Sequence, residues 1–181
     1  MSEPRIPPVT DPDPEQRQVL ELTRVTAPDG SVANIFATLA HHPRLLKRFS
    51  QLGGSLLFRS LVPAREREIV ILRVGWRCRS VYEFGQHTLI GRSAGLTDAE
   101  IATLAGGDTS GMAAHEQDLV ALADELCAED RVSDATWARL ASRWSDAELV
   151  ELLVLAGFYR LVSGFLNSAG VQLDPGVPGW P

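Results

Sequence analysis

The chain has 181 residues, of which 45% are hydrophobic and 22% charged, so it is long and apolar enough to fold as one domain around a buried core. Its 17 basic and 23 acidic residues give a net charge of -6, which excludes the positive field that nucleic-acid binding needs. Lys47 is the only lysine, and the remaining basic residues are arginines, whose planar guanidinium groups pair well with carboxylates. We therefore expect a small carboxylated molecule as the partner, and no nucleic acid.

Residues 1–14 are polar and rich in proline, unlike a signal peptide, and the longest apolar stretches, 69–72 and 152–158, are far shorter than the roughly 20 residues that cross a bilayer. Cys78 and Cys127 stand far apart in the sequence with no second thiol expected near either, which argues against a disulfide framework or a metal cage. These features favour a soluble, cytoplasmic protein with no membrane partner and no metal.

Apolar residues recur at helical spacing along almost the whole chain, and no segment alternates apolar and polar residues as a half-buried strand does. The sequence therefore predicts an all-α fold. We expect a flexible proline-rich arm over residues 1–14, a single helical domain over 15–170, and a Pro/Gly-rich strap over 171–181. The strap should lie on a surface of the domain or on a neighbouring subunit.

The predicted helices begin and end at characteristic residues. A turn at 28–30 ends the first helix, Pro63 begins the fourth and Gly95 ends the fifth, while 97–100 and 145–148 are capping boxes that open two further helices. In chain order, helices are expected over residues 15–25, 34–40, 43–61, 62–76, 80–95, 97–106, 113–128, 133–143 and 145–169.

Two of these helices have unusual composition. Gly53 and Gly54 should weaken the third helix midway, because glycine is a poor helix former. The last helix is apolar around much of its circumference, which is typical of a core or subunit-contact helix. We therefore expect the protein to be a homo-oligomer.

Polar and ionisable residues are most concentrated among apolar residues between positions 65 and 92. Glu68 shares a helical stripe with apolar residues and should point inward, where a carboxylate needs a partner or a function. On the following helix Glu83 and His87 are four residues apart and therefore neighbours on one face, with Tyr82 and Gln86 alongside at the same spacing. Two carboxylates and an imidazole that converge could transfer protons near neutral pH without a cofactor.

The same residues have a purely structural interpretation, since Glu and His at this spacing are common on helices and Glu68 could pair with an arginine. An anionic substrate would need a cation, and Arg73, Arg77, Arg79 and Arg92 are the nearest candidates for a bidentate clamp. The histidines His41, His42 and His115 lack the spacing of a metal pair and are expected at capping or surface positions. Cys127 is expected to be a small buried hydrophobic residue, and the role of Cys78 stays open.

Three segments, 67–72 (REIVIL), 82–87 (YEFGQH) and 94–101 (AGLTDAEI), resemble the carboxymuconolactone decarboxylase family, which includes the alkylhydroperoxidase D-like proteins. The resemblance covers roughly residues 34–122. It implies the alkylhydroperoxidase D-like helical fold, association into dimers, trimers or hexamers, and a site near a subunit contact.

The family has a peroxidase branch and a decarboxylase branch. The peroxidase branch carries a Cys-x-x-Cys pair seven and four residues before the His, and these positions are Ser80 and Glu83 here. Cys78 is displaced from both, so we reject the thiol-peroxidase interpretation. The decarboxylase branch resembles this sequence at Glu83 and His87. By that resemblance His87 would deliver a proton to carbon as carbon dioxide leaves, Glu83 would orient the imidazole, and Glu68 would complete the relay.

In the same interpretation Tyr82 and Gln86 would bind substrate oxygens, and Arg73, Arg77 or Arg92 would hold a carboxylate. The resulting hypothesis is a cofactor-independent enzyme that decarboxylates or isomerises a small carboxylated unsaturated or lactone compound. The alternatives are a non-catalytic oligomer of the same fold that binds a small acid or serves in assembly, and, with less support, an antioxidant protein. Convergence of Glu68, Glu83 and His87 in an apolar cavity would favour the enzyme.

Overall fold

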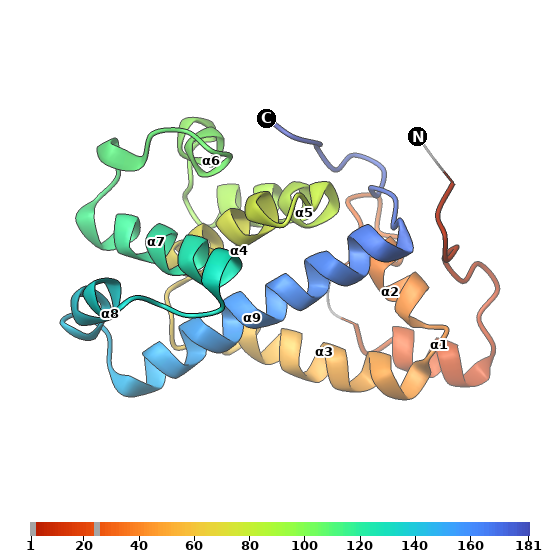
Figure 1. Cartoon of the computed structure of the whole chain (residues 1–181). Coiled ribbons are helices and arrows are strands. Elements are labelled where there is room, and N and C mark those ends of the chain that lie inside the picture. Colours follow the sequence, from red (N-terminus) through yellow and green to blue (C-terminus); the bar gives the residue numbers. More distant parts are fainter. Residues whose placement is uncertain (1–2, 24–25) are drawn as a thin grey trace.

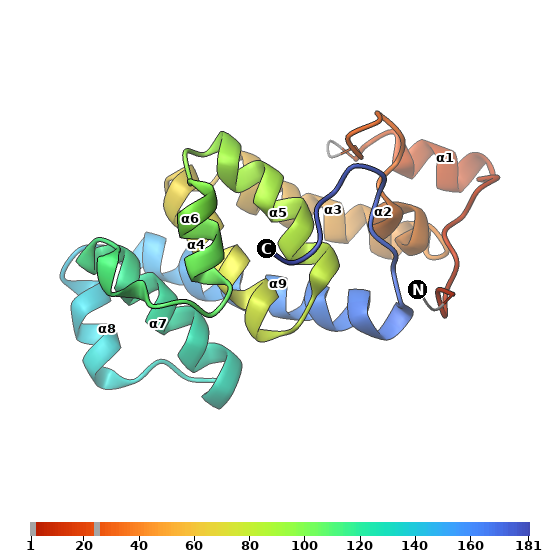
Figure 2. The ribbon, with the colours of Figure 1, turned by 90° about the horizontal axis from the view of Figure 1, so that it is seen from above.

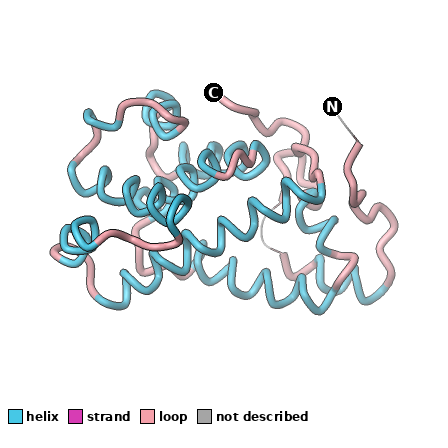
Figure 3. The backbone as a smooth tube through the Cα atoms, viewed as in Figure 1, coloured by secondary structure: helices cyan, strands magenta, loops and turns pink. Residues whose placement is uncertain are grey.

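The computed structural model describes residues 3–23 and 26–181 (Figure 1). Within these residues the regular structure is helical, and the β structure is limited to an isolated bridge between Thr26 and Val32 (Figure 3). The all-α prediction is confirmed. The helices are α1 (Pro14–Leu20), α2 (Asn34–Leu39), α3 (Pro43–Phe58), α4 (Ala64–Arg77), α5 (Val81–Ser93), α6 (Asp98–Leu104), α7 (Ala114–Glu129), α8 (Asp134–Ala141) and α9 (Asp146–Ala169), with a 3-10 turn, η1 (Thr109–Gly111).

Both predicted capping boxes begin helices. The backbone N–H of Thr97 donates to Glu100 at the start of α6, and that of Ser145 donates to Glu148 at the start of α9, each at 2.8 Å. The last helix ends at Gly170, whose positive φ of 69° is the left-handed cap that glycine adopts without strain.

Two helices differ from the sequence-based expectation. Helix α1 ends at Leu20, and of the five further residues predicted as helical, Arg24 and Val25 lie outside the described residues. Helix α3 is continuous through its two glycines, because Gly53 packs against the ring of Phe158, where an added Cβ would lie only 3.3 Å from the ring. Close packing against α9 thus replaces the local helix propensity that glycine lacks.

Helix α4 is the centre of the bundle. It packs against α5, α7 and α9, and its four consecutive residues Ile69, Val70, Ile71 and Leu72 are completely buried. Because this part of α4 is buried on all sides, its sequence is apolar at every position and shows no helical periodicity. Helix α9 crosses the whole molecule and also contacts α3, α5, α7 and α8 (Figure 1).

By length and hydropathy alone, α9 could span a membrane, contrary to the expectation that no segment could. That expectation counted only uninterrupted apolar residues, whereas α9 combines its apolar residues with a few polar ones over 24 residues. One side of α9, which includes Leu152, Leu155 and Leu166, is buried within the bundle, as in a core helix.

Both terminal segments lie on the helical bundle. The strap passes over α5 (Figure 2), so closely that a Cβ on Gly85 would lie 2.2 Å from the carbonyl oxygen of Pro178. Trp180 packs against Trp76 and Phe84, with ring centroids 5.1 and 5.2 Å away. In the N-terminal arm, Arg5 N–H donates to the carbonyl oxygen at the end of α9 at 2.9 Å.

Candidate functional site

The structure brings the three predicted site residues of α4 and α5 together. The imidazole of His87 lies between two carboxylates, with Nδ1 2.6 Å from Oε2 of Glu68 and Nε2 3.1 Å from Oε1 of Glu83. All three side chains are buried, and the other oxygen of Glu68 accepts from Arg67 Nε at 3.0 Å. The four groups form a continuous buried chain of alternating acid and base.

The charges of these four groups favour the protonated form of the His87 imidazole. Burial by itself lowers the pKa of His87, but the negative charge and hydrogen bond of Glu68, together with those of Glu83, outweigh burial and raise the pKa to about 10. His87 therefore holds a proton at neutral pH. Both ring nitrogens are then donors, and each has a carboxylate oxygen within hydrogen-bond distance.

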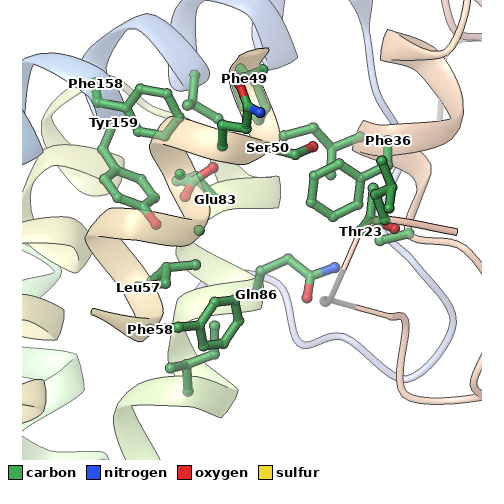
Figure 4. A pocket seen from close by; sticks show the side chains of 18 of the residues that line it. Thr23, Phe36, Phe49, Ser50, Leu57, Phe58, Glu83, Gln86, Phe158 and Tyr159 are labelled. Carbon is green, nitrogen blue, oxygen red and sulfur yellow. The ribbon is translucent and has the colours of Figure 1, made fainter. Parts of the chain in front are cut away.

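The cluster lies beside a cavity of about 330 Å³ formed by α2, α3, α5 and α9 (Figure 4). Glu83 and His87 line the cavity, whereas Glu68 lies behind His87 and does not. Most of the wall is apolar, with aromatic rings from four helices: Phe36, Phe49, Phe58, Phe158, Tyr159 and Tyr82. Such a cavity accepts a small, largely apolar molecule and strengthens electrostatic interactions inside it.

Tyr159 also lines the cavity, although no sequence pattern marks it as a site residue. Its ring packs edge-on against His87, with centroids 4.9 Å apart, and its hydroxyl points into the cavity (Figure 4). Burial, followed by the charges of Glu83 and Glu68, raises the pKa of this hydroxyl well above its usual value, so it is a hydrogen-bond donor. In the sequence Tyr159 appears only as one of many apolar residues of a core helix, and its local pattern carries no sign of a site.

Tyr82 and Gln86, predicted to bind substrate, also line the cavity, but both are engaged by the strap. The hydroxyl of Tyr82 donates to Asp174 at 2.5 Å, Gln86 Nε2 donates to the same carboxylate, and Asn34 N–H donates to its other oxygen at 2.8 Å. Burial and the hydrogen bond to Asp174 raise the pKa of Tyr82. These contacts fix the strap and α2 against α5 and give Tyr82 and Gln86 a structural role.

The cavity is not lined by the arginines predicted to hold a carboxylate, which are Arg73, Arg77, Arg79 and Arg92. Arg73 makes a bidentate pair with Asp124 of α7 at 2.6 and 2.8 Å, and Arg77 approaches the same carboxylate at 3.5 Å. Arg92 pairs with Asp98 at 2.7 Å on the surface. These residues are near Glu83 along the chain. However, the positions of Arg73, Arg77 and Arg92 around their helix axes direct their side chains toward partners outside the cavity.

The cavity has two other cations, Lys47 and Arg59, at opposite ends of α3. Both are exposed, and neither makes an ion pair within the part of the chain that the structure describes. Lys47 stands out in the sequence as the only lysine, but no sequence pattern indicates that α3 and α5 line the same cavity. Among the described residues, no group of three or more His, Cys, Asp or Glu side chains is arranged to hold a metal ion.

The two cysteines differ from the expectation that neither has a second thiol nearby. They come close together in space: Cys127, in the last turn of α7, and Cys78, at the end of α4, each shift the pKa of the other thiol. Both are free and half-buried, and neither lines the cavity. The packing of α4 on α7 brings together residues that are distant in sequence. Ser80 and Glu83 occupy the positions where the peroxidase branch has its Cys-x-x-Cys pair.

The all-helical fold is the one that alkylhydroperoxidase D-like proteins share. The model of the carboxymuconolactone decarboxylase family matches residues 43–125, a segment that contains the whole Glu68–Glu83–His87 cluster. Among curated proteins, none matches the sequence significantly.

Solved structures share the fold over nearly the whole chain. An uncharacterised peroxidase-related protein from Silicibacter sp. TM1040 is 18% identical, with a TM-score of 0.80 over 97% of this chain and 96% of that one. A peroxidase-related protein with an alkylhydroperoxidase AhpD core, from Ralstonia eutropha JMP134, is 20% identical, with a TM-score of 0.78 over 94% and 90%. The debrominase Bmp8 is 14% identical, with a TM-score of 0.77 over 94% and 92%. At these identities the likeness shows the fold.

Proposed function

We propose that the protein is a cofactor-independent enzyme that transfers a proton to carbon in a small carboxylated unsaturated or lactone compound, by decarboxylation or by isomerisation. The observation that carries the proposal is the protonated His87, held between Glu68 and Glu83 on the wall of an apolar cavity. A purely structural ion pair would not need to face a cavity of about 330 Å³.

In the decarboxylation the carbon–carboxylate bond breaks, carbon dioxide leaves, and the electron pair moves into the unsaturated system of the substrate. The His87 imidazolium then donates its proton to carbon, forming the new carbon–hydrogen bond. A pKa of about 10 retains this proton until a strongly basic carbanion appears. Water returns a proton to the neutral imidazole after the product leaves.

The neighbouring groups have distinct roles in this scheme. Glu68 holds Nδ1 from behind the ring and raises its basicity, so it is a positioning residue that does not touch the substrate. Glu83 holds Nε2 and lines the cavity. The hydroxyl of Tyr159 can donate to a substrate oxygen where negative charge develops, which stabilises the transition state more in an apolar cavity than in water.

The wall of the cavity supports a small unsaturated substrate with an anionic group. Aromatic rings pack well on flat unsaturated molecules, and Lys47 and Arg59 supply positive charge for a carboxylate. A structure of a variant of the debrominase Bmp8 holds 2,3,4-tribromopyrrole, a small ring compound, and its fold matches this chain with a TM-score of 0.73. That structure supports the idea that this fold accepts small flat rings.

Proton NMR in heavy water tests the proposal. The purified protein is incubated with 4-carboxymuconolactone and a panel of related unsaturated carboxylic acids, and we expect loss of carbon dioxide or incorporation of deuterium at carbon with at least one of them. The reaction should be abolished in His87→Asn, which keeps a polar side chain but cannot transfer the proton.

The matched control is His115→Asn, which removes a histidine on α7 that lies 3.8 Å from Glu66 and outside the cavity. It should retain full turnover. Turnover that survives in His87→Asn would refute the role of His87. Silence of the wild type across the panel, together with binding of these acids, would instead favour the non-catalytic alternative, a helical protein that binds a small acid.

A further inference from the structure

The wall that α3 contributes to the cavity contains a glycine at its centre. Ser50, Gly54 and Leu57 lie one helical turn apart, so they share one face of α3, and all three line the cavity. Figure 4 shows Ser50 and Leu57 at the cavity. A side chain at position 54 would project into the cavity between them. Because glycine has no side chain, the helix backbone itself forms the wall at this point.

The space in front of Gly54 is almost free of protein atoms. In the described part of the chain, a Cβ on Gly54 would come within 4 Å of one side chain only, that of Phe58, whose Cδ2 atom would lie 3.9 Å away. This distance is an ordinary van der Waals contact. Gly54 also has no positive φ, so its backbone accepts a side chain without strain. The effect of glycine at this position is therefore to leave room in the cavity.

The preceding glycine has a different role. Gly53 points about 100° away from Gly54 around the helix axis. It faces α9, where an added Cβ would lie only 3.3 Å from the ring of Phe158. The next residue of α9 is Tyr159, whose ring packs edge-on against His87. Close packing at Gly53 thus positions the part of α9 that carries the Tyr159 hydroxyl, whereas Gly54 faces the interior of the cavity.

Helix α5 contributes another wall, and its side chains are held in place. Gln86, His87 and Ile90 line the cavity from this helix. The amide nitrogen of Gln86 donates to Asp174 of the strap, and the imidazole of His87 lies between two buried carboxylates. These contacts prevent the α5 wall from yielding to a larger ligand. The size of the ligand that fits then depends on what projects from α3.

We propose that Gly54 is a specificity-determining residue, which admits flat ring compounds that carry a second fused ring or a bulky ring substituent directed toward α3. A side chain at this position would exclude these compounds and leave room for smaller rings. The inference rests on the proposed function in one respect, namely that the cavity is the substrate site. It does not depend on the reaction that follows binding.

NMR titration with two flat unsaturated acids of different size tests this role. The probes are benzoate, with one ring, and 2-naphthoate, with two fused rings, and the ring signals of His87 report binding in the cavity. The wild type should bind both acids. Gly54→Leu should weaken the binding of 2-naphthoate roughly 10-fold or more and that of benzoate much less, because only the larger ring reaches the new side chain. Gly54→Ala should have an intermediate effect on 2-naphthoate.

Urea unfolding separates this effect from damage to the fold. Alanine and leucine are better helix formers than glycine, so neither Gly54 variant should unfold at a lower urea concentration than the wild type. Gly53→Ala should do so, because the ring of Phe158 must move. The matched control is Ser55→Leu, which adds the same side chain to an exposed position of α3 outside the cavity. It should leave the affinity for both acids unchanged.

Three results would overturn the role of Gly54: equal weakening of both acids in Gly54→Leu, weakening of neither, or a wild type whose His87 signals do not respond to 2-naphthoate. These results differ from a failure of the proposed reaction. Size-selective binding without turnover of any acid would support the role of Gly54 and refute the reaction. Turnover that Gly54→Leu changes equally for large and small substrates would refute the role of Gly54 and leave the reaction standing.

Discussion

The Nδ1 atom of His87 lies 2.6 Å from Oε2 of Glu68, although the two residues belong to different helices and Glu68 does not reach the cavity. This hydrogen bond and its charge are the largest favourable contribution to the raised pKa of His87. The catalytic proposal therefore depends on Glu68, which acts through His87. The effect of Glu68 on the pKa of His87 can be measured.

Glu68→Gln should lower the pKa of His87, because a neutral amide replaces the carboxylate. It should also reduce the free energy of unfolding by roughly 3–5 kcal/mol, since the variant leaves the charges of Arg67 and His87 without their shared partner. NMR titration of the His87 ring and urea unfolding check both effects. Glu66→Gln, two residues earlier on α4, is the matched control and should leave the His87 titration unchanged.

The stability of the wild type should depend on pH through His87. The folded-state pKa, about 10, exceeds the usual 6.5, so the stabilisation is fully present below about pH 6.5 and is lost as pH rises toward 10. Urea unfolding at pH 6, 8 and 10 should show a decline in the wild type that is smaller in His87→Asn. Parallel pH profiles of the two proteins would contradict the raised pKa.

Tyr159→Phe tests whether the Tyr159 hydroxyl takes part in catalysis or whether the residue serves only in packing. The ring packs edge-on against His87, but its hydroxyl makes no hydrogen bond to any described residue, so the variant should unfold at nearly the wild-type urea concentration. If the hydroxyl stabilises developing charge, kcat should fall roughly 10- to 100-fold with little change in KM. A large loss of stability with unchanged kcat would assign Tyr159 to packing alone.

Lys47→Gln and Arg59→Gln should weaken substrate binding. These cations lie at the cavity and lack carboxylate partners among the described residues, so each should raise KM roughly 3- to 10-fold and leave kcat nearly unchanged. Arg92→Gln is the control, because its guanidinium is paired with Asp98 away from the cavity. An equal effect of all three variants would indicate general electrostatic attraction rather than a contact.

We also propose that copies of the chain associate through α9 and α3. Val150, Val154 and Leu161 of α9 are 61%, 43% and 60% exposed, and α3, which contacts α9, exposes Leu52 and Phe58. Exposed apolar residues on adjoining helices are typical of a subunit contact. Light scattering after gel filtration should show an oligomer that Leu161→Glu shifts toward monomer, whereas Arg131→Glu, on an exposed loop, should not.

The sequence by itself determined the helical class and most helix boundaries. Helical periodicity and local caps, such as those at Thr97 and Ser145, depend on residues three or four positions apart, and these signals survive without tertiary information. The inward position of Glu68 and the pairing of Glu83 with His87 were predictable for the same reason, because spacing along one helix fixes which side chains share a face.

Only the tertiary structure decided which helices meet, since their contacts depend on packing between residues far apart in the chain. It turned Arg73 toward Asp124, brought Lys47 and Tyr159 to the cavity, and placed Cys127 beside Cys78. A one-dimensional pattern gives the direction of a side chain around its own helix axis, but the angle and contact between two helices follow from how their surfaces interlock.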